Sequence, residues 1–592
     1  MSVFYEDLLL VIPQMVLGAD NPGNIHSPNR FDCSPLVQVQ RIRSLESDRN
    51  GQSPSSETAS TTMNQPISTE VSAPKDTPAK RAESGRLARW FIRNSRWLAL
   101  AITAVGFAVR VRYVLSCYLN PDEAQHFDAA RFNTWHQVFL ASHRLSHPPL
   151  FIFVLHAVLS LGRSEFFVRL PSLAGGTAAL WLTFAWIRRS LGEIPALIGL
   201  VFMAVSPAAI SASIEARQYG LLLFFLCGAL YACERMFTER SLPWAIVDGL
   251  LLLGTLLTHF TALVIICSVD LYVLLRCLLE RMPRRIVWVL IANQVLLAGV
   301  FAWLYLSYIH HAEVLNSQSM SYLRTMYYMP GQETLFQFLK RAILSTFSYL
   351  VSQRLAIRSL ALVYFAAAMT LLIGPDKAKR LLAILILATF ATGLVAAICH
   401  VFPFAGSRHQ TYLLPFLAMG YAALYRWVPA QFSPVLVIVA IALSPVWLLR
   451  NLPDNNQKMM PIEDERSAVD YIHRVVPPRA PLFMDDATWY VFSYYLGRYD
   501  SALDVDINRG NRSVEGHLLV SPRSFGWILK PSDAIDQVNE AARTFAPFGN
   551  AGANHWIVSD TWPDPPLGPQ LTSASVQRMR AFGEISVIEV KQ

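Results

Sequence analysis

The stretch that decides the fold is residues 97–128, WLALAITAVGFAVRVRYVLSCYLNPDEAQHFD. Its first part, Trp97 to Leu115, is an apolar run about as long as the roughly 20 residues that a helix needs to cross a bilayer. Basic residues flanking a span stay on the cytoplasmic side. The run is preceded by a basic flank, which predicts a cytoplasmic amino terminus and places the acidic segment Asn120 to Asp128 outside. This flank consists of Arg81, Arg86, Arg89, Arg93 and Arg96.

The composition of the whole chain is that of a membrane protein. Of its 592 residues, 53% are hydrophobic and only 16% are charged, whereas soluble domains carry roughly 25% charged residues. The formal net charge is +8, but the arginines stand at the ends of apolar runs, so we expect no nucleic-acid partner. The seven cysteines follow neither a disulfide framework nor a zinc-binding spacing.

Apolar runs recur as far as Leu449 and predict about eleven membrane spans. Under eleven alternating spans, the basic clusters between them all fall on the cytoplasmic side. The count requires the apolar piece Pro148 to Leu161 not to cross, and at ~1.5 Å per residue it is too short for a hydrocarbon core of about 30 Å. We expect it to be a short helix at the outer face. The ten spans after the first are expected at Phe166 to Ile187, Ile194 to Ser213, Gly220 to Met236, Trp244 to Thr258, Ala262 to Leu279, Ile286 to Tyr308, Ala361 to Ile373, Leu381 to Cys399, Tyr412 to Trp427 and Val435 to Leu449.

Three regions follow from this pattern. Residues 1–85, rich in Ser, Thr, Pro, Gln and Asn, predict a disordered cytoplasmic tail. Residues 86–452 hold the spans, and residues 453–592 have the pattern of a soluble α/β domain, which the odd number of spans places on the extracytoplasmic side. The predicted fold class is mainly α, a polytopic helical membrane bundle with a C-terminal α/β domain. Within that domain we expect helices at 463–476 and 531–542, and strands at 482–484, 555–559 and 585–590.

Ionisable residues gather in the loops predicted to lie outside. Charged groups at a membrane boundary are costly unless they are paired with one another or used in function. A carboxylate suits a general base, and arginine suits phosphate because its planar fork gives bidentate, charge-assisted bonds. A solvated loop with paired charges and a polar functional cavity are both compatible with the pattern. The charged positions are Asp122, Glu123, Glu215, Arg217 and Arg408.

Three histidines accompany these charges. His147 stands in Ser-His-Pro-Pro-Leu at the entrance to the short outer helix, His259 stands at a predicted helix end, and His409 follows Arg408 directly. The two prolines after His147 fix the direction of the chain and leave the imidazole at the interface. A structural role is the ordinary expectation for His147 and His259, and a polar cavity would give them another.

The order of these motifs resembles that of the GT-C membrane glycosyltransferases. The motifs are the Asp122-Glu123 pair, His-Pro-Pro-Leu, Glu-Ala-Arg-Gln-Tyr, Thr-His-Phe and the late Arg-His. The nearest branch is the group of protein mannosyltransferases and lipid A aminoarabinose or galacturonic acid transferases (glycosyltransferase family 39/83-like). The resemblance covers roughly Trp97 to Leu449.

The resemblance implies a donor made of a sugar on a polyprenyl phosphate, and an acceptor hydroxyl on a lipid, glycan or protein. It implies that Asp122 is the catalytic base, with Glu123 beside it, and that His147 and His259 line the cavity. No cofactor follows with certainty. Some GT-C enzymes have an Asp-containing metal motif where this chain has Glu-Ala-Arg, so dependence on a divalent metal ion stays open. The residues implied in binding the donor phosphate or sugar are Glu215, Arg217, Tyr219, Arg408 and His409.

The functional hypothesis is therefore a multi-pass inner-membrane glycosyltransferase, transferring a hexosyl or pentosyl group on the extracytoplasmic face of the bilayer. A transporter or flippase for a lipid-linked glycan is the alternative, because intramembrane charges also mark transport pathways. Transporters usually show internal repeats with broken helices near the membrane centre, and we find no such repeat in the sequence. A noncatalytic scaffold would explain the topology but leaves the charged cluster without a purpose.

Overall fold

The computed structural model describes residues 78–145, 147–309, 323–351, 357–451, 461–477 and 480–497, and shorter pieces at 512–514, 517–521, 525, 529–530, 534–545, 554–560 and 576–591. Residues 1–77, most of the predicted cytoplasmic tail, lie outside this described part. Residues 78–85, also assigned to the tail, are helical, because helix α2 runs over Pro78–Ser116. The basic flank is therefore continuous with the first span.

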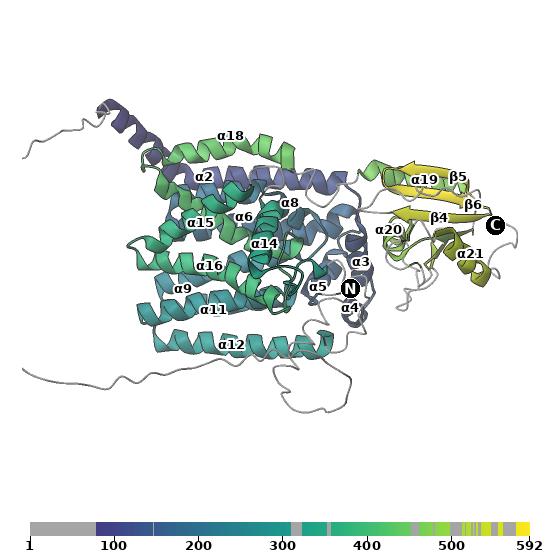
Figure 1. The fold of residues 1–592 in the computed structure, drawn as a ribbon, viewed down its shortest axis with the longest axis horizontal. Coiled ribbons are helices and arrows are strands. Elements are labelled where there is room, and N and C mark those ends of the chain that lie inside the picture. The colour runs from purple at the N-terminus through teal and green to yellow at the C-terminus, as the bar shows by residue number, and fades with distance from the viewer. Residues whose placement is uncertain are drawn as a thin grey trace, which may run out of the picture.

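Six helices in the described part are long and apolar enough to cross a membrane, and they lie side by side in one bundle (Figure 1). Each falls on a span predicted from the sequence. They are α2, α6 (Glu165–Leu191), α9 (Tyr219–Glu239), α11 (Ala262–Glu280), α12 (Arg284–Leu304, continued by the π-helical turn η1, Tyr305–Ile309) and α16 (Lys377–Ile398).

The other five predicted spans fall on shorter or broken helices. One is a bent pair, three are apolar helices of less than full length by the same test, and one combines an α-helix with two 3-10 turns. All eleven predicted runs are thus helical, and the polytopic, mainly helical fold class is confirmed. These elements are α7 (Glu193–Val205) with α8 (Pro207–Ile214), α10 (Leu242–Thr258), α15 (Ile357–Ile373), α18 (Ser433–Asn451), and η2 (Arg408–Leu413) with α17 (Leu414–Ala422) and η3 (Ala423–Trp427).

The bend between α7 and α8 has an identifiable cause. Ser206 caps α8 by accepting a hydrogen bond from the Ala209 amide, and Pro207 occupies the first turn, where its missing N–H is tolerated. Arg110 of α2 is fully buried and donates to the carbonyls of Met203 and Ala204 at 3.3 and 3.2 Å. A guanidinium at the last carbonyls of α7 satisfies groups that the helix leaves unpaired. The 60° bend directs α8 toward the segment 215–218.

Basic residues at the ends of α6 and α9 contact neighbouring helix ends at the end of the bundle opposite α3 (Figure 1). Arg189, in the last turn of α6, pairs with Glu239 at the end of α9 at 2.7 Å. Arg240 donates to the Glu280 carbonyl at the end of α11 at 3.3 Å. These contacts agree with spans that alternate in direction. Such spans place the loops that carry Asp122, Arg217 and Arg408 at the opposite end of the bundle, near α3.

Three short helices cover the end of the bundle at which α2 finishes: α3 (Pro121–Ala130), α4 (Trp135–Ser142) and α5 (Leu150–Val158). α5 corresponds to the short outer helix expected at 148–161, and its nine residues extend only about 13 Å. α3 begins with a capping box, in which Asn120 accepts from the Glu123 amide while the Glu123 side chain accepts from the Asn120 amide. Pro121 occupies the first turn. A further helix, α14 (Leu335–Leu350), packs against α15.

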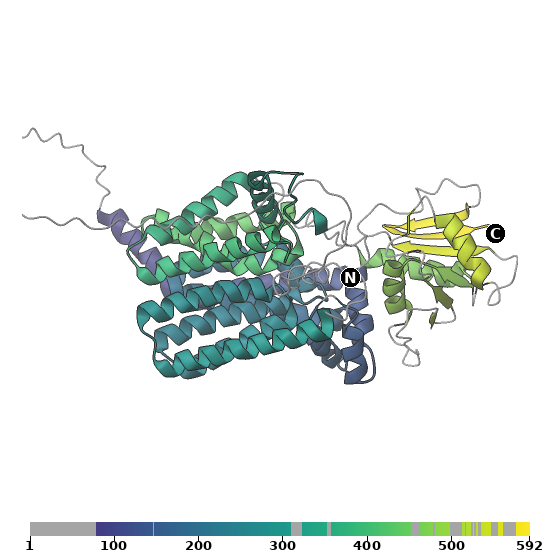
Figure 2. The ribbon, with the colours of Figure 1, turned by 60° about the horizontal axis from the view of Figure 1, so that its bottom comes forward.

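The C-terminal part is an α/β unit beyond the same end of the bundle (Figures 1 and 2). Its sheet has the order β2-β3-β1-β4-β6-β5, with β1 parallel to β3 and β4 and the other pairs antiparallel. The five elements expected from the sequence correspond to α19, β1, α21, β4 and β6, while α20, β2, β3 and β5 were not predicted. The elements are α19 (Ile462–Val475), β1 (Pro481–Phe483), α20 (Asp486–Gly497), β2 (Arg512–Val514), β3 (His517–Val520), α21 (Ala534–Phe545), β4 (His555–Asp560), β5 (Val576–Phe582) and β6 (Ile585–Val590).

The α/β unit and the membrane-proximal helices share one hydrophobic core. Phe127 of α3 meets Tyr494 of α20 edge to face, with ring centroids 4.8 Å apart. The Tyr495 hydroxyl accepts from the Leu119 amide at 2.9 Å, and the Tyr118 hydroxyl donates to Asp560 at 3.3 Å. The segment that leads into α3 is therefore held from both sides, by the bundle and by the α/β unit.

Candidate active site

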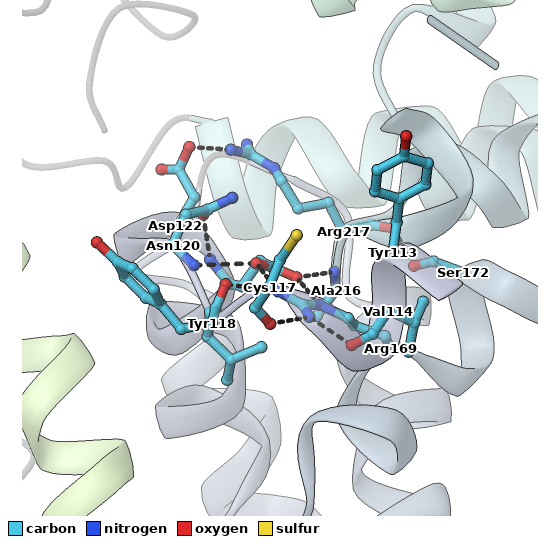
Figure 3. A network of polar contacts seen from close by, with 12 residues as sticks. Tyr113, Val114, Cys117, Tyr118, Asn120, Asp122, Arg169, Ser172, Ala216 and Arg217 are labelled. Carbon is cyan, nitrogen blue, oxygen red and sulfur yellow. Dashed lines mark hydrogen bonds and ion pairs between the residues drawn. The ribbon is translucent and has the colours of Figure 1, made fainter. Parts of the chain in front are cut away.

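Two arginines far apart in the sequence converge on Asp122 at the start of α3. Arg217, from the segment between α8 and α9, and Arg408, at the start of η2, both donate through Nη1 to Asp122 Oδ2, the latter at 2.8 Å. The three side chains are 18, 5 and 28% exposed for Asp122, Arg217 and Arg408. Figure 3 shows Arg217 reaching across to Asp122. The sequence-predicted Asp122, Arg217 and Arg408 thus form one charged cluster.

The charge of this cluster favours an ionised carboxylate. Burial alone would raise the pKa of Asp122, but the positive charges of Arg217 and Arg408 outweigh it and hold that pKa well below its ordinary value. Two guanidiniums face one carboxylate, so the cluster carries a net positive charge and can accept a further anion. Asp122 occupies one hydrogen-bonding position on Arg217, and the Nε of that arginine has no partner within the described residues.

Glu123, the neighbouring carboxylate, points into a different network. Arg169 of α6 binds it with two parallel hydrogen bonds of 2.7 and 2.8 Å, and the Ala216 and Asn120 amides donate to it at 2.7 and 2.9 Å. Both side chains are buried, at 1 and 3% exposure. The oxygens of Glu123 are therefore occupied by the protein itself, an arrangement suited to holding Asp122 in place rather than to touching a substrate.

Arg169 completes this network and was not among the residues singled out from the sequence. Its guanidinium also donates to the carbonyls of Val114, Cys117 and Tyr118 at 2.7 to 2.9 Å, where α2 ends (Figure 3). An arginine within the apolar run that forms α6 was the signal that could have found it, because intramembrane charges are rarely without a partner.

Glu215 lies beside the cluster, and it forms no ion pair within the described part of the chain. It is 6% exposed, and its Oε1 has no hydrogen-bond partner within the described residues. Burial, together with the nearby charge of Glu123, raises the pKa of Glu215 to about 8, against the opposing effect of Arg217. Its carboxyl is therefore largely protonated at neutral pH. Tyr219, the next predicted site residue, is 2% exposed. The Arg217 guanidinium carbon lies over the Tyr219 ring, 5.6 Å from the centroid of that ring.

The predicted histidines line up with a fourth that the sequence analysis passed over, His126 of α3. Neighbouring ring centroids are 5.5 Å apart between His126 and His147, 5.6 Å between His147 and His259, and 5.9 Å between His259 and His409. Burial and the charge of Arg217 lower the pKa of His126 to about 4 and that of His259 to about 3. The pKa values of His147 and His409 are lowered for the same main reason, burial. The row is therefore uncharged at neutral pH.

His126 could have been found from its spacing, because residues four apart on a helix share a face and His126 follows Asp122 by four. Within the part of the chain that the structure describes, no three His, Cys, Asp or Glu side chains lie together so as to hold a metal ion. Dependence on a divalent metal ion therefore stays an open prediction of the sequence.

Comparison with known proteins agrees with this architecture. Residues 146–308 match the family of dolichyl-phosphate-mannose-protein mannosyltransferases, and no curated protein sequence matches the chain. The fold is similar to that of ArnT from Cupriavidus metallidurans bound to undecaprenyl phosphate, with a TM-score of 0.52, 13% identity, and coverage of 83% of this chain and 97% of that one. The apo form of that protein gives a TM-score of 0.51 with the same identity and coverage.

The protein O-mannosyltransferase complex Pmt1-Pmt2 of S. cerevisiae, bound to the sugar donor, is also similar over 40% of this chain and 36% of its own. The identity is 20% and the TM-score 0.29, and we infer nothing from it. The ArnT likeness covers 83% of this chain, and the predicted resemblance is confirmed at the level of the fold. This chain therefore has the fold of a multi-pass helical membrane protein, similar to that of ArnT.

Proposed function

We propose that the protein moves a monosaccharide, a hexose or pentose, from a polyprenyl-phosphate donor to a hydroxyl of an envelope lipid, glycan or protein. The reaction takes place on the extracytoplasmic face of the inner membrane, with the α/β unit on the same side. The observation that carries the proposal is the convergence of Arg217 and Arg408 on Asp122. The undecaprenyl phosphate bound by a protein of the same fold supports the choice of donor.

The chemistry of transfer matches this cluster. The bond from the acceptor oxygen to the anomeric carbon forms as the bond from that carbon to the phosphate oxygen breaks, and the phosphate departs with the electron pair. Arg217 and Arg408 meet the negative charge that develops on the phosphate, and such preorganised charge is usually the largest single contribution to catalysis. The acceptor hydroxyl must also lose a proton, for which the family resemblance names Asp122.

Glu123 and Arg169 fix the geometry that this chemistry requires. A misplacement of a catalytic group by about 1 Å costs roughly 100-fold in rate. Arg169 ties the end of α2 to Glu123 in the first turn of α3, and Glu123 also accepts from the Ala216 amide beside Arg217. The buried ion pair between Glu123 and Arg169 therefore positions both Asp122 and Arg217.

The experiment supplies radiolabelled polyprenyl-phosphate monosaccharides, one sugar at a time, to the purified protein reconstituted in vesicles with envelope lipids. Label in a new lipid, glycan or protein product supports the proposal. Movement of the labelled lipid across the bilayer with no product would support the transporter alternative. A comparison of envelope lipids and glycans from cells with and without the gene then identifies the acceptor.

A further inference from the structure

A cavity opens at the opposite end of α3 from Asp122, between the carboxyl ends of α3 and α5. Its volume is about 490 Å³, which lies within the roughly 300–1,000 Å³ that is usual for ligand pockets. Arg131, at the end of α3, lines the cavity. It follows Asp122 by nine residues, or about 13 Å along the helix axis. The cavity is therefore separate from the charged cluster at the start of α3.

The polar side chains that line this cavity are basic or neutral. Arg131 comes from the end of α3, and Arg163 comes from the segment between α5 and α6. Within the described part of the chain, no acidic residue lines the cavity. Guanidinium groups bind phosphate through bidentate, charge-assisted hydrogen bonds, so the cavity favours an anion. The other polar lining residues are Asn133, His156 and Ser160.

Hydrogen bonds within the protein hold the walls of the cavity in place. His156 of α5 donates through Nδ1 to the Ala130 carbonyl at the end of α3, at 2.8 Å. The Arg163 carbonyl accepts from the Tyr494 hydroxyl of α20, at 2.9 Å. Because both sides of the cavity are fixed in this way, binding there requires little reorganisation of the protein.

The rim of the cavity lies at the boundary of the bilayer. Trp135, which lines the cavity, is 56% exposed, and Leu161, next to Ser160, is 66% exposed. α4 packs on α12, because Phe139 stacks on Trp303 with ring centroids 6.4 Å apart. α12 buries only four of its 21 residues, so most of its apolar surface faces lipid. Exposed tryptophans are typical of the membrane interface, and at this rim they can meet the acyl chains of a lipid.

We propose that this cavity binds the head group of an anionic phospholipid of the outer leaflet, one whose phosphodiester has no cationic group beside it. Arg131 and Arg163 bind the phosphate, while Trp135 and Leu161 contact the acyl chains. The bound lipid joins the end of α3 to the segment after α5. Binding at this site does not depend on the proposed transfer reaction, although the lipid would steady the helix that carries Asp122.

The experiment titrates the purified full-length protein in detergent with phosphatidylglycerol and, separately, with phosphatidylcholine. A ligand of the folded state raises the melting temperature as its concentration passes its Kd. The wild-type protein should reach half of its stabilisation at a phosphatidylglycerol concentration at least ~5-fold lower than that of phosphatidylcholine. Glycerol phosphate, the soluble head group, should give no stabilisation at the same concentrations.

Two variants locate the site. Ser160→Glu places a negative charge at an exposed position of the cavity, and Arg163→Gln removes a positive charge. Each should raise the half-stabilising concentration of phosphatidylglycerol about 5-fold. The melting temperature without lipid shows whether each variant is folded, and either one alone is sufficient for the test.

Ser116→Glu and Arg112→Gln are the matched controls. They make the same charge changes at exposed positions near the end of α2, outside the cavity. Ser116 matches Ser160 closely, because each hydroxyl donates to the carbonyl three residues earlier. Both controls should shift the half-stabilising concentration less than about twofold.

Three results would overturn the proposal. Equal stabilisation by the two phospholipids would show that the site does not recognise the lipid charge. Equal shifts in the test and control variants would show that phosphatidylglycerol responds to surface charge in general. Stabilisation by glycerol phosphate at the same concentrations would mean that the cavity takes a soluble phosphate and not a lipid.

Discussion

Arg408 Nη1 lies 2.8 Å from Asp122 Oδ2, and the same oxygen accepts from Arg217. The carboxylate therefore uses one donor of each guanidinium and places a negative charge beside any phosphate that binds the other donors, so it weakens the binding of that phosphate. Replacement of Asp122 by Asn removes this negative charge. We expect undecaprenyl phosphate to bind the Asp122→Asn protein about 3- to 10-fold more tightly, equivalent to ~0.7–1.4 kcal/mol, while sugar transfer falls at least about 100-fold.

Binding is measured from intrinsic tryptophan fluorescence and transfer with the labelled donor. Glu239→Gln is the matched control, because Glu239 is also held by two arginines, Arg189 and Arg235, at the opposite end of the bundle. This control should change neither quantity. Weaker binding of undecaprenyl phosphate to Asp122→Asn would contradict this effect of the carboxylate.

Replacement of either arginine by lysine tests whether shape matters as well as charge. Lysine keeps the positive charge but lacks the planar fork that binds Asp122 and a phosphate oxygen together. We expect Arg217→Lys and Arg408→Lys each to lower kcat/KM by roughly 10- to 100-fold, a loss of ~1.4–2.7 kcal/mol in transition-state stabilisation. The loss should be larger for Arg217, which is 5% exposed, than for Arg408, which is 28% exposed. Arg189→Lys serves as the control, and an unchanged kcat/KM in both test variants would argue against phosphate binding by the cluster.

The membrane part of the fold was predictable because a helix that crosses the bilayer must be apolar along most of its length, and such runs are easily recognised in the sequence. A span needs a long apolar run, and all eleven predicted runs are helical. In the α/β unit, helices and strands can be predicted only from apolar residues that repeat on one face, which is a weaker signal. α20 is buried almost throughout, so it lacks the one-sided pattern that predicts a helix, and β5 is a mainly exposed edge strand without a buried face.

The site was predictable only in part, because the sequence shows which residues are charged but not which residues their side chains contact. Asp122, Arg217 and Arg408 stand out as charges at a membrane boundary, and their contacts follow from the fold. Glu123 shares every sequence feature that recommends Asp122, yet its side chain leaves the helix toward Arg169. Only the direction of each side chain within the first turn of α3 separates the two roles, and no sequence pattern encodes it.

The ion pair between Glu123 and Arg169 should be more important to stability than to binding. Glu123→Gln leaves the Arg169 guanidinium buried without a counter-charge, which typically costs 3–5 kcal/mol. The double variant Glu123→Leu with Arg169→Met removes both charges and should recover much of that loss. Thermal unfolding in detergent measures both. Transfer should stay low in the double variant because α3 loses its link to Ala216, so full recovery of activity along with stability would show that the pair does not position Asp122.

Glu215 gives the protein a pH dependence whose sign can be worked out. Burial raises the pKa of Glu215 to about 8, above the ordinary value of roughly 4.3 that it has in the unfolded chain. Between these values the folded protein keeps a proton that the unfolded chain has released, so this contribution to stability is complete at low pH and is lost as the pH rises to about 8. We expect the melting temperature of the wild-type protein, relative to Glu215→Gln, to fall by roughly 2–5 °C between pH ~5 and ~8. Differential scanning fluorimetry across this range measures it, and a constant difference between the two proteins would mean that Glu215 is ionised in the folded state.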